Sequence, residues 1–134
     1  MGAWGPRNFE NDTARDFAGD YADLPGEALL LSALATALEE EDLMESEVAQ
    51  EALAAAEIVA AALGKPGSDF PASLQAAVAG LDLGEDSELQ EMAQEAVEAV
   101  LEASELQELW AESPEYANWQ AVQQDLLNRL QAPE

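Results

Sequence analysis

Carboxylates are the side chains with which this sequence could do chemistry, because it contains 29 Asp and Glu residues but no cysteine and no histidine. Carboxylate oxygens are the ligands that calcium and magnesium prefer. A single straight helix would spread the aspartates near the start of the chain along its length, so we expect a solvated acidic face and no metal or cofactor. These aspartates recur at helical spacing: Asp12, Asp16, Asp20 and Asp23.

The missing residue types exclude most familiar catalytic arrangements. Without cysteine and histidine there are no disulfides, no thiolate nucleophiles, no zinc sites of the usual kind and no imidazole base. A pair of carboxylates could still hydrolyse a glycosidic bond, one as acid and one as base. The spacing singles out no such pair. We therefore expect a protein that is not an enzyme, and a carboxylate-based, cation-dependent hydrolase is the alternative.

The charge balance points to the kind of partner the chain could bind. With only 4 Lys and Arg residues, the formal net charge is −25. Such a chain repels nucleic acids and anionic membranes and attracts basic proteins. The densest acidic patch either steers a basic partner to this surface or is an acidic loop in an acidic protein. That patch comprises Glu39, Glu40, Glu41, Asp42, Glu45 and Glu47.

Glu57 interrupts an otherwise apolar run and poses a structural question. If it is buried, it needs a partner. The Trp4 indole, Arg15 and the backbone N–H groups of the opening loop could each supply one. If it is exposed, the alanines beside it simply face water. Both interpretations stay open, and both favour a structural role over a catalytic one.

Helices must position these residues, and the central one spans residues 48–63. This run is rich in alanine and apolar over most of its circumference, which indicates a buried helix that neighbours can approach closely. No segment alternates with period two, so no strands are expected. Further helices are predicted over residues 12–21, 26–38, 71–80, 88–101, 105–110 and 114–130, and the N-cap candidates are Asn11 or Asp12, Ser46, Ser87, Ser104 and Ser113.

The aromatic residues are expected to lie in or against the core. Trp4 and Phe9 stand among glycines in residues 1–10, which we interpret as a loop packed on the core. Trp110, Tyr116 and Trp119 are more typical of core than of a ligand platform, although a contiguous exposed part of them would indicate a protein interface.

Length and patterning together predict the architecture. The 134 residues are expected to form one domain, an all-α, antiparallel multi-helix bundle around the alanine-rich helix. No signal peptide is recognised, and Glu57 interrupts the best apolar stretch, so no membrane span is expected. The absence of cysteine fits a reducing compartment. We expect a cytoplasmic protein.

Three stretches carry a resemblance to a known family. They are the opening MGAWG followed by Phe9, Asn11 and Asp12, the run AAEIVAA at residues 55–61, and SEL at 104–106 followed by Leu109 and Trp110. On these residues the chain resembles a bacterial domain-of-unknown-function family, number 4259. Pro6 and Arg7 depart from the small residue and glycine of that family's opening turn. The resemblance implies a fold and no chemistry. The function expected from charge is therefore an acidic protein-binding module, comparable to immunity or inhibitor proteins.

Overall fold

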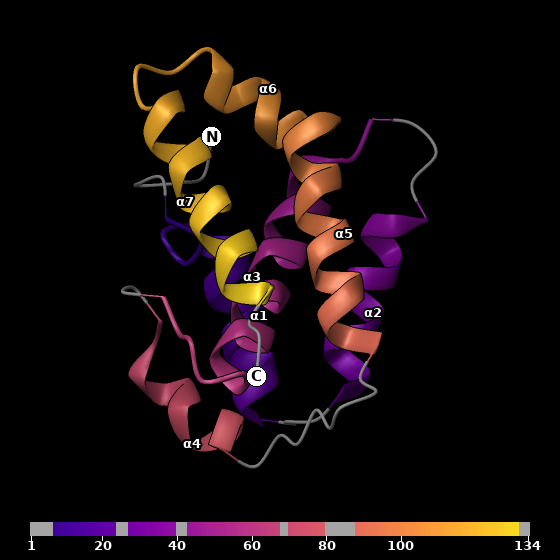
Figure 1. Ribbon diagram of the computed structural model, residues 1–134, viewed down its shortest axis with the longest axis vertical. Coiled ribbons are helices and arrows are strands. Elements are labelled where there is room, and N and C mark those ends of the chain that lie inside the picture. The colour runs from indigo at the N-terminus through magenta and orange to yellow at the C-terminus, as the bar shows by residue number, and fades with distance from the viewer. Residues whose placement is uncertain (1–6, 24–26, 40–42, 68–69, 80–87, 132–134) are drawn as a thin grey trace.

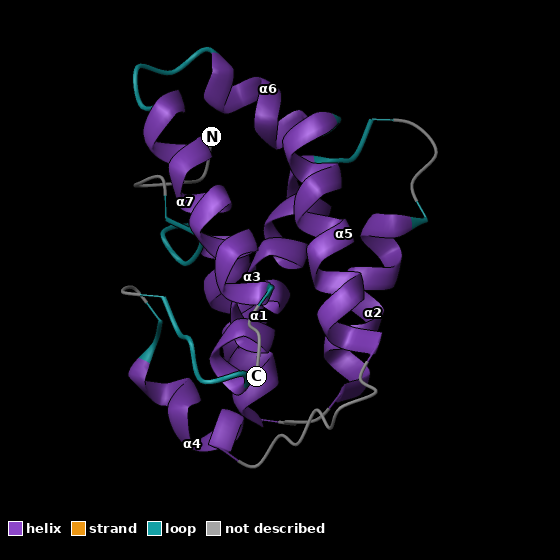
Figure 2. Cartoon of the chain, viewed as in Figure 1, coloured by secondary structure: helices purple, strands orange, loops and turns teal. Residues whose placement is uncertain are grey.

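The computed structural model describes residues 7–23, 27–39, 43–67, 70–79 and 88–131. The elements are α1 (Asp12–Asp23), α2 (Glu27–Leu38), α3 (Ser46–Ala62), a 3₁₀ turn (Ala72–Leu74), α4 (Gln75–Ala79), α5 (Glu88–Glu102), α6 (Glu105–Ala111) and α7 (Tyr116–Leu130). The described residues contain no strand (Figure 2). The predicted all-α bundle is confirmed.

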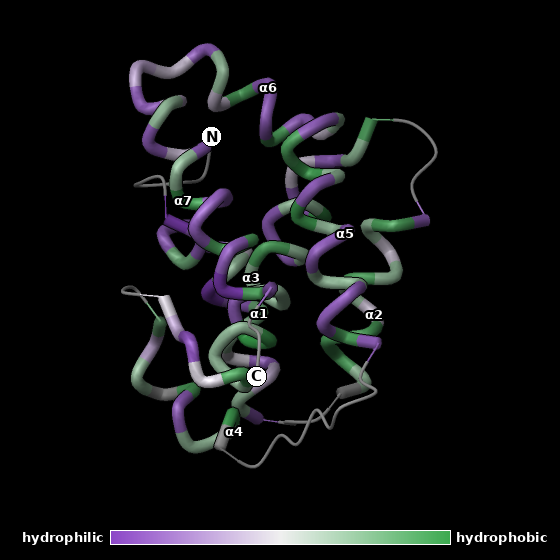
Figure 3. Tube along the Cα trace, in the orientation of Figure 1, coloured by the Kyte–Doolittle hydropathy of each residue, from purple (hydrophilic) through white to green (hydrophobic). Residues whose placement is uncertain are grey.

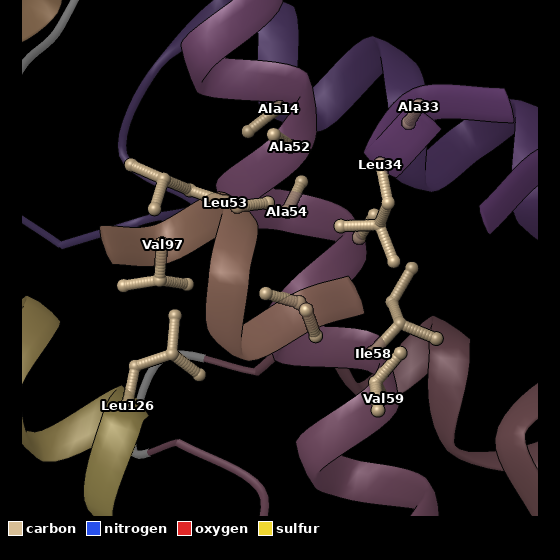
Figure 4. Packing of buried hydrophobic residues seen from close by; sticks show 14 of the residues in the cluster. Ala14, Ala33, Leu34, Ala52, Leu53, Ala54, Ile58, Val59, Val97 and Leu126 are labelled. Atoms are coloured by element: carbon tan, nitrogen blue, oxygen red, sulfur yellow. The ribbon is translucent and has the colours of Figure 1, made fainter. Parts of the chain in front are cut away.

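Helix α3 is the axis around which the other helices pack. It contacts α1, α2, α4, α5, α6 and α7 (Figure 1). Every residue from 52 to 60 is buried. Alanines on this helix allow close approach, while larger side chains from α2, α5 and α7 fill the remaining space. Figure 4 shows this mixture in Ala52, Ala54, Leu34, Val97 and Leu126. The predicted central helix is therefore confirmed.

Gly64 ends α3 as the sequence predicts. Its φ of 91° is a conformation that residues with a Cβ rarely adopt. The backbone N–H of Gly64 donates to Ala61 O and that of Lys65 donates to Ala60 O, both at 2.9 Å. These two bonds form a Schellman motif, which satisfies carbonyls that the end of a helix would otherwise leave unpaired.

Helix α5 covers α3 with one face and presents the other to solvent. Its buried residues are Leu89, Ala93, Ala96, Val97 and Val100. In Figure 3, hydrophilic and hydrophobic segments alternate along its tube, as expected of an amphipathic helix. The side chains of Gln90 and Gln94 donate to Leu130 O at 2.7 and 2.9 Å. Helix α5 therefore also caps the C-terminal turn of α7.

Two of the predicted N-caps are observed. The Asn11 side chain accepts from the backbone N–H of Ala14 at 2.7 Å. The Ser104 hydroxyl accepts from the backbone N–H of Gln107 at 3.0 Å and donates to Val100 O at 2.7 Å. Ser104 therefore joins the end of α5 to the start of α6. Ser87 lies outside the described residues.

The predictions for Ser46 and Ser113 are wrong. Ser46 is the first residue of α3, and Glu45 holds the N-cap position without a side-chain cap. The backbone N–H of Ser46 instead donates to Glu105 Oε1 at 3.2 Å, so a carboxylate from α6 caps the start of α3. Ser113 accepts from the backbone N–H of Glu115 two residues later, which forms a turn before α7 begins.

The aromatic residues near the end of the chain belong to the core. Trp119 stacks between Trp110 and Tyr116, with ring centroids 6.5 and 6.1 Å away. Trp110 and Trp119 are buried, and Tyr116 is partly buried. This arrangement fixes α6 against α7.

Candidate functional site

Glu57 is buried on α3 and is held by hydrogen bonds from two distant parts of the chain. Its side chain is 1% exposed. Oε1 accepts from Nη1 of Arg129 at 2.9 Å, and Oε2 accepts from Nη2 of Arg129 at 3.2 Å and from Nδ2 of Asn8 at 2.8 Å. The structure thus decides between the two interpretations of Glu57 in favour of burial.

The partners of Glu57 differ from those expected. Arg15 does not reach it, because its Nε donates to the carbonyl of Phe9 at 2.8 Å. The opening loop does contribute, but through the side-chain amide of Asn8. Trp4 lies outside the described residues. The sequence could not indicate Arg129, because 72 residues separate it from Glu57.

Asn8 and Gln123 complete the network. Gln123 Nε2 donates to Asn8 Oδ1 at 2.8 Å, and Asn8 Nδ2 donates to Gln123 Oε1 at 3.1 Å. Both residues are buried, so this reciprocal amide pair satisfies groups that have no access to bulk water. We refer to Asn8, Glu57, Gln123 and Arg129 as the buried network.

Residues 64–67 close over the ion pair. Nη1 of Arg129 also donates to Lys65 O at 3.2 Å. A Cβ on Gly67 would stand 3.0 Å from Glu57 Oε1 and 3.3 Å from Arg129 Nη1, which explains why glycine suits this position. Burial lowers the pKa of Arg129, but its hydrogen bonds and charge interactions with Glu57 and Asp125 outweigh that effect and leave the pKa raised. The guanidinium therefore stays charged and neutralises Glu57.

The aspartates of α1 face solvent and do not converge. Asp12, Asp16, Asp20 and Asp23 are all exposed. Within the described ranges, no group of three or more acidic side chains is arranged to hold a metal ion. The charge of Asp20 does act on α3. Burial, followed by the charges of Glu47 and Asp20, raises the pKa of Glu51.

A longer acidic surface, which the sequence reasoning missed, runs along α5 and α6. All of its glutamates are exposed, and residues 88–112 contain no Lys or Arg. The signal was present, since these glutamates recur every three or four residues opposite the apolar period of α5. We refer to them as the α5–α6 acidic face: Glu88, Glu91, Glu95, Glu98, Glu102, Glu105, Glu108 and Glu112.

One part of the predicted acidic patch, Glu45 and Glu47, lies beside this face. Glu39, Glu45 and Glu47 are exposed, whereas Glu40, Glu41 and Asp42 lie outside the described residues. The backbone of Met44 pairs with the α5–α6 junction, because its N–H donates to Ala103 O at 3.1 Å and its carbonyl accepts from Glu105 N–H at 2.7 Å. This pairing brings residues 43–47 beside the middle of the α5–α6 acidic face.

The remaining predicted residues have structural positions. Phe9 is fully buried and meets Phe70 edge to face, with ring centroids 5.8 Å apart. Asn11 is buried as the N-cap of α1, and Trp110 is buried against Trp119. These three residues stabilise the bundle rather than line a site.

Comparison with known protein families gives a match. A family model described as "Domain of unknown function (DUF4259)" matches residues 2–122. No curated protein and no solved structure matches the chain. The matched range includes Asn8, Glu57 and the whole α5–α6 acidic face, and it ends just before Gln123 and Arg129. Among the described helices, none is long and apolar enough to cross a membrane.

Proposed function

This chain belongs to the DUF4259 family of domains of unknown function, and from that premise we propose that it is a non-enzymatic, acidic protein-binding module that engages a basic partner protein. The observation that carries the proposal is the charge of the α5–α6 acidic face, which no ion pair among the described residues neutralises. Neither helix contains a cation, and the ion pairs of Arg129 use Glu57 and Asp125, which lie elsewhere. A surface of one sign attracts the opposite sign and accelerates association with it.

Two exposed leucines support the choice of this surface. Leu43 and Leu109 are 41% and 39% exposed, and they are the exposed large hydrophobic residues of the described chain. Leu109 belongs to α6, and Leu43 precedes Met44, which pairs with the α5–α6 junction. Protein interfaces combine apolar contacts with a polar rim, so leucines beside an acidic face suit a protein partner better than a free cation.

The state of Glu57 supports a role without catalysis. A general acid or base must lie within hydrogen-bond reach of the substrate with which it exchanges a proton. The buried carboxylate of Glu57 is instead paired with a guanidinium and an amide. The exposed carboxylates lie along helix faces, where they are suited to long-range attraction. The proposed role is to block or escort a basic protein.

A pull-down with matched charge variants tests the proposal. The tagged chain is incubated with lysate of its source at about 50 mM and about 500 mM salt, since screening weakens surface electrostatics, and bound proteins are identified by mass spectrometry. One variant carries Glu91→Gln, Glu95→Gln and Glu98→Gln. The control carries Asp16→Asn, Asp20→Asn and Asp23→Asn, which remove the same charge from α1.

We expect a basic protein that binds at low salt, is released at high salt and is retained by the α1 control. The α5 variant should weaken the interaction about tenfold, equivalent to about 1.4 kcal/mol. Equal losses in both variants would show that only net charge matters, and the proposed surface would be wrong. The absence of any basic protein at low salt would contradict the proposal as a whole.

A further inference from the structure

The opening segment, residues 7–11, and the last turn of α7 meet at the same buried carboxylate. Asn8 from the opening segment and Arg129 from α7 both donate to Glu57, across 49 and 72 positions of sequence. We infer that the hydrogen bonds to Glu57 couple the packing of these two segments, so that loosening either one loosens the other. This device is separate from the α5–α6 acidic face.

The opening segment depends on Asn8 for its position. The Asn8 side chain bonds to Glu57 and Gln123, and its carbonyl accepts from Nδ2 of Asn11 at 3.3 Å. Asn11 in turn caps the backbone N–H of Ala14. A chain of hydrogen bonds therefore runs from Glu57 through Asn8 to the first turn of α1.

The last turn of α7 depends on the same carboxylate from the other side. Arg129 reaches over Gly67 to make two bonds to Glu57 and one to Lys65 O. The adjacent residue, Leu130, is fully buried, and its carbonyl accepts from Gln90 and Gln94. Displacement of Arg129 would therefore strain a packed helix end.

The two segments are coupled because Asn8 and Arg129 share the Glu57 carboxylate, so neither donor can leave without a free-energy cost at that carboxylate. Withdrawal of Asn8 removes partners from Glu57 Oε2 and from Gln123 in a buried position, where an unsatisfied polar group is costly. Withdrawal of Arg129 leaves Glu57 buried without a countercharge, which favours entry of water and movement of Asn8. Thermodynamic linkage requires that release of Asn8 changes the free energy for releasing Arg129 by the same amount as release of Arg129 changes the free energy for releasing Asn8. A partner that binds the opening segment and displaces Asn8 from Glu57 would thus loosen the end of α7.

Amide hydrogen exchange on the full chain tests this coupling. In the Arg129→Met variant, the exchange rates of the Ala14 and Arg15 amides, in the first turn of α1, are measured. Asn8→Ala is made to read exchange at Leu130 and Gln131. Asp125→Asn is the control, because it removes the other carboxylate bound to Arg129. The Asp125 side chain is 67% exposed. Amides of α3 report unfolding of the whole protein, so end amides that exchange faster report local opening.

We expect each variant to raise local exchange at the far segment about tenfold, within the usual range of coupling between sites. The control should change both segments less than about twofold, as exposed ion pairs contribute little. If Arg129→Met does not fold, Arg129→Lys, which keeps the charge but loses the fork, should give a smaller effect in the same direction. Acceleration confined to the substituted end would overturn the inference. Exchange of both ends only together with α3 would also overturn it.

Discussion

Glu57 and Arg129 form a two-pronged ion pair between side chains that are 1% and 14% exposed, with Oε1–Nη1 and Oε2–Nη2 distances of 2.9 and 3.2 Å. Removing one partner of a buried pair is costly because it leaves the other charge uncompensated. Arg129→Met should therefore lower the free energy of unfolding by about 3 kcal/mol. Glu57→Gln should cost less, because the amide is neutral and Arg129 retains Asp125.

Urea denaturation measures both changes, and the double variant Glu57→Gln/Arg129→Met supplies the interaction energy. Asp125→Asn is the matched control and should stay within about 0.5 kcal/mol of the parent, as exposed pairs do. Similar losses for Arg129→Met and Asp125→Asn would mean that burial of the pair contributes nothing.

Glycine positions offer a second test, because the structure gives Gly67 and Gly19 different surroundings. A Cβ at Gly67 would crowd Glu57 and Arg129, and neither can move without breaking the buried network. Gly67→Ala should therefore destabilise by about 1–3 kcal/mol, as overpacking does. Gly19 lies within α1 with open space around its Cα, so Gly19→Ala should stabilise by about 0.5–1 kcal/mol. Thermal unfolding would show opposite shifts, and shifts of the same sign would refute the assignment.

Local patterns were enough to predict the helices of this fold. The alanine-rich run, the stop at Gly64 and the cap at Asn11 each depend on a few neighbouring residues, and each was found where expected. The same local reasoning failed at Ser46. There the group that bonds the helix start is Glu105, which comes 59 residues later.

The buried network was only partly predictable for the same reason. Glu57 was recognisable because a charge within an apolar run must find a partner if it is buried. Asn8, Gln123 and Arg129 look like ordinary polar residues until the bundle brings them to one point. The α5–α6 acidic face was readable from spacing. In a chain with 29 carboxylates, however, periodic acidic residues stand out less than a consecutive run such as Glu39–Asp42.

Ser104 should contribute more to stability than Ser46. Its hydroxyl caps α6 and also donates to Val100 O, and the residue is fully buried. Ser104→Ala should cost about 1–2 kcal/mol, the range for loss of an N-cap. Ser46→Ala should change stability by less than about 0.5 kcal/mol, because the residue lies inside α3 and alanine favours helix. Chemical denaturation compares the two, and equal losses would contradict the cap assignment.

Glu51 should make the protein less stable as pH rises. Burial, then the charges of Glu47 on the same helix and Asp20 on α1, raise its pKa in the folded state above its ordinary value. Between the ordinary and the raised pKa, the folded state binds more protons than the unfolded state, so the free energy of unfolding falls with increasing pH. The penalty is complete above the raised pKa and absent below the ordinary pKa. Glu51→Gln should therefore stabilise at pH 7 by up to about 1 kcal/mol, since the side chain is partly solvated.

The gain from Glu51→Gln should disappear at about pH 4, near the ordinary pKa of a glutamate. Glu98→Gln removes the same unit of charge from an exposed position on α5. It therefore separates the local effect at Glu51 from the lower overall charge repulsion in a chain of net charge −25. Urea titrations of both variants and the parent at pH 4, 5.5 and 7 provide the comparison. If the two substitutions stabilise equally at every pH, the benefit comes from net charge, and the local repulsion around Glu51 is not its source.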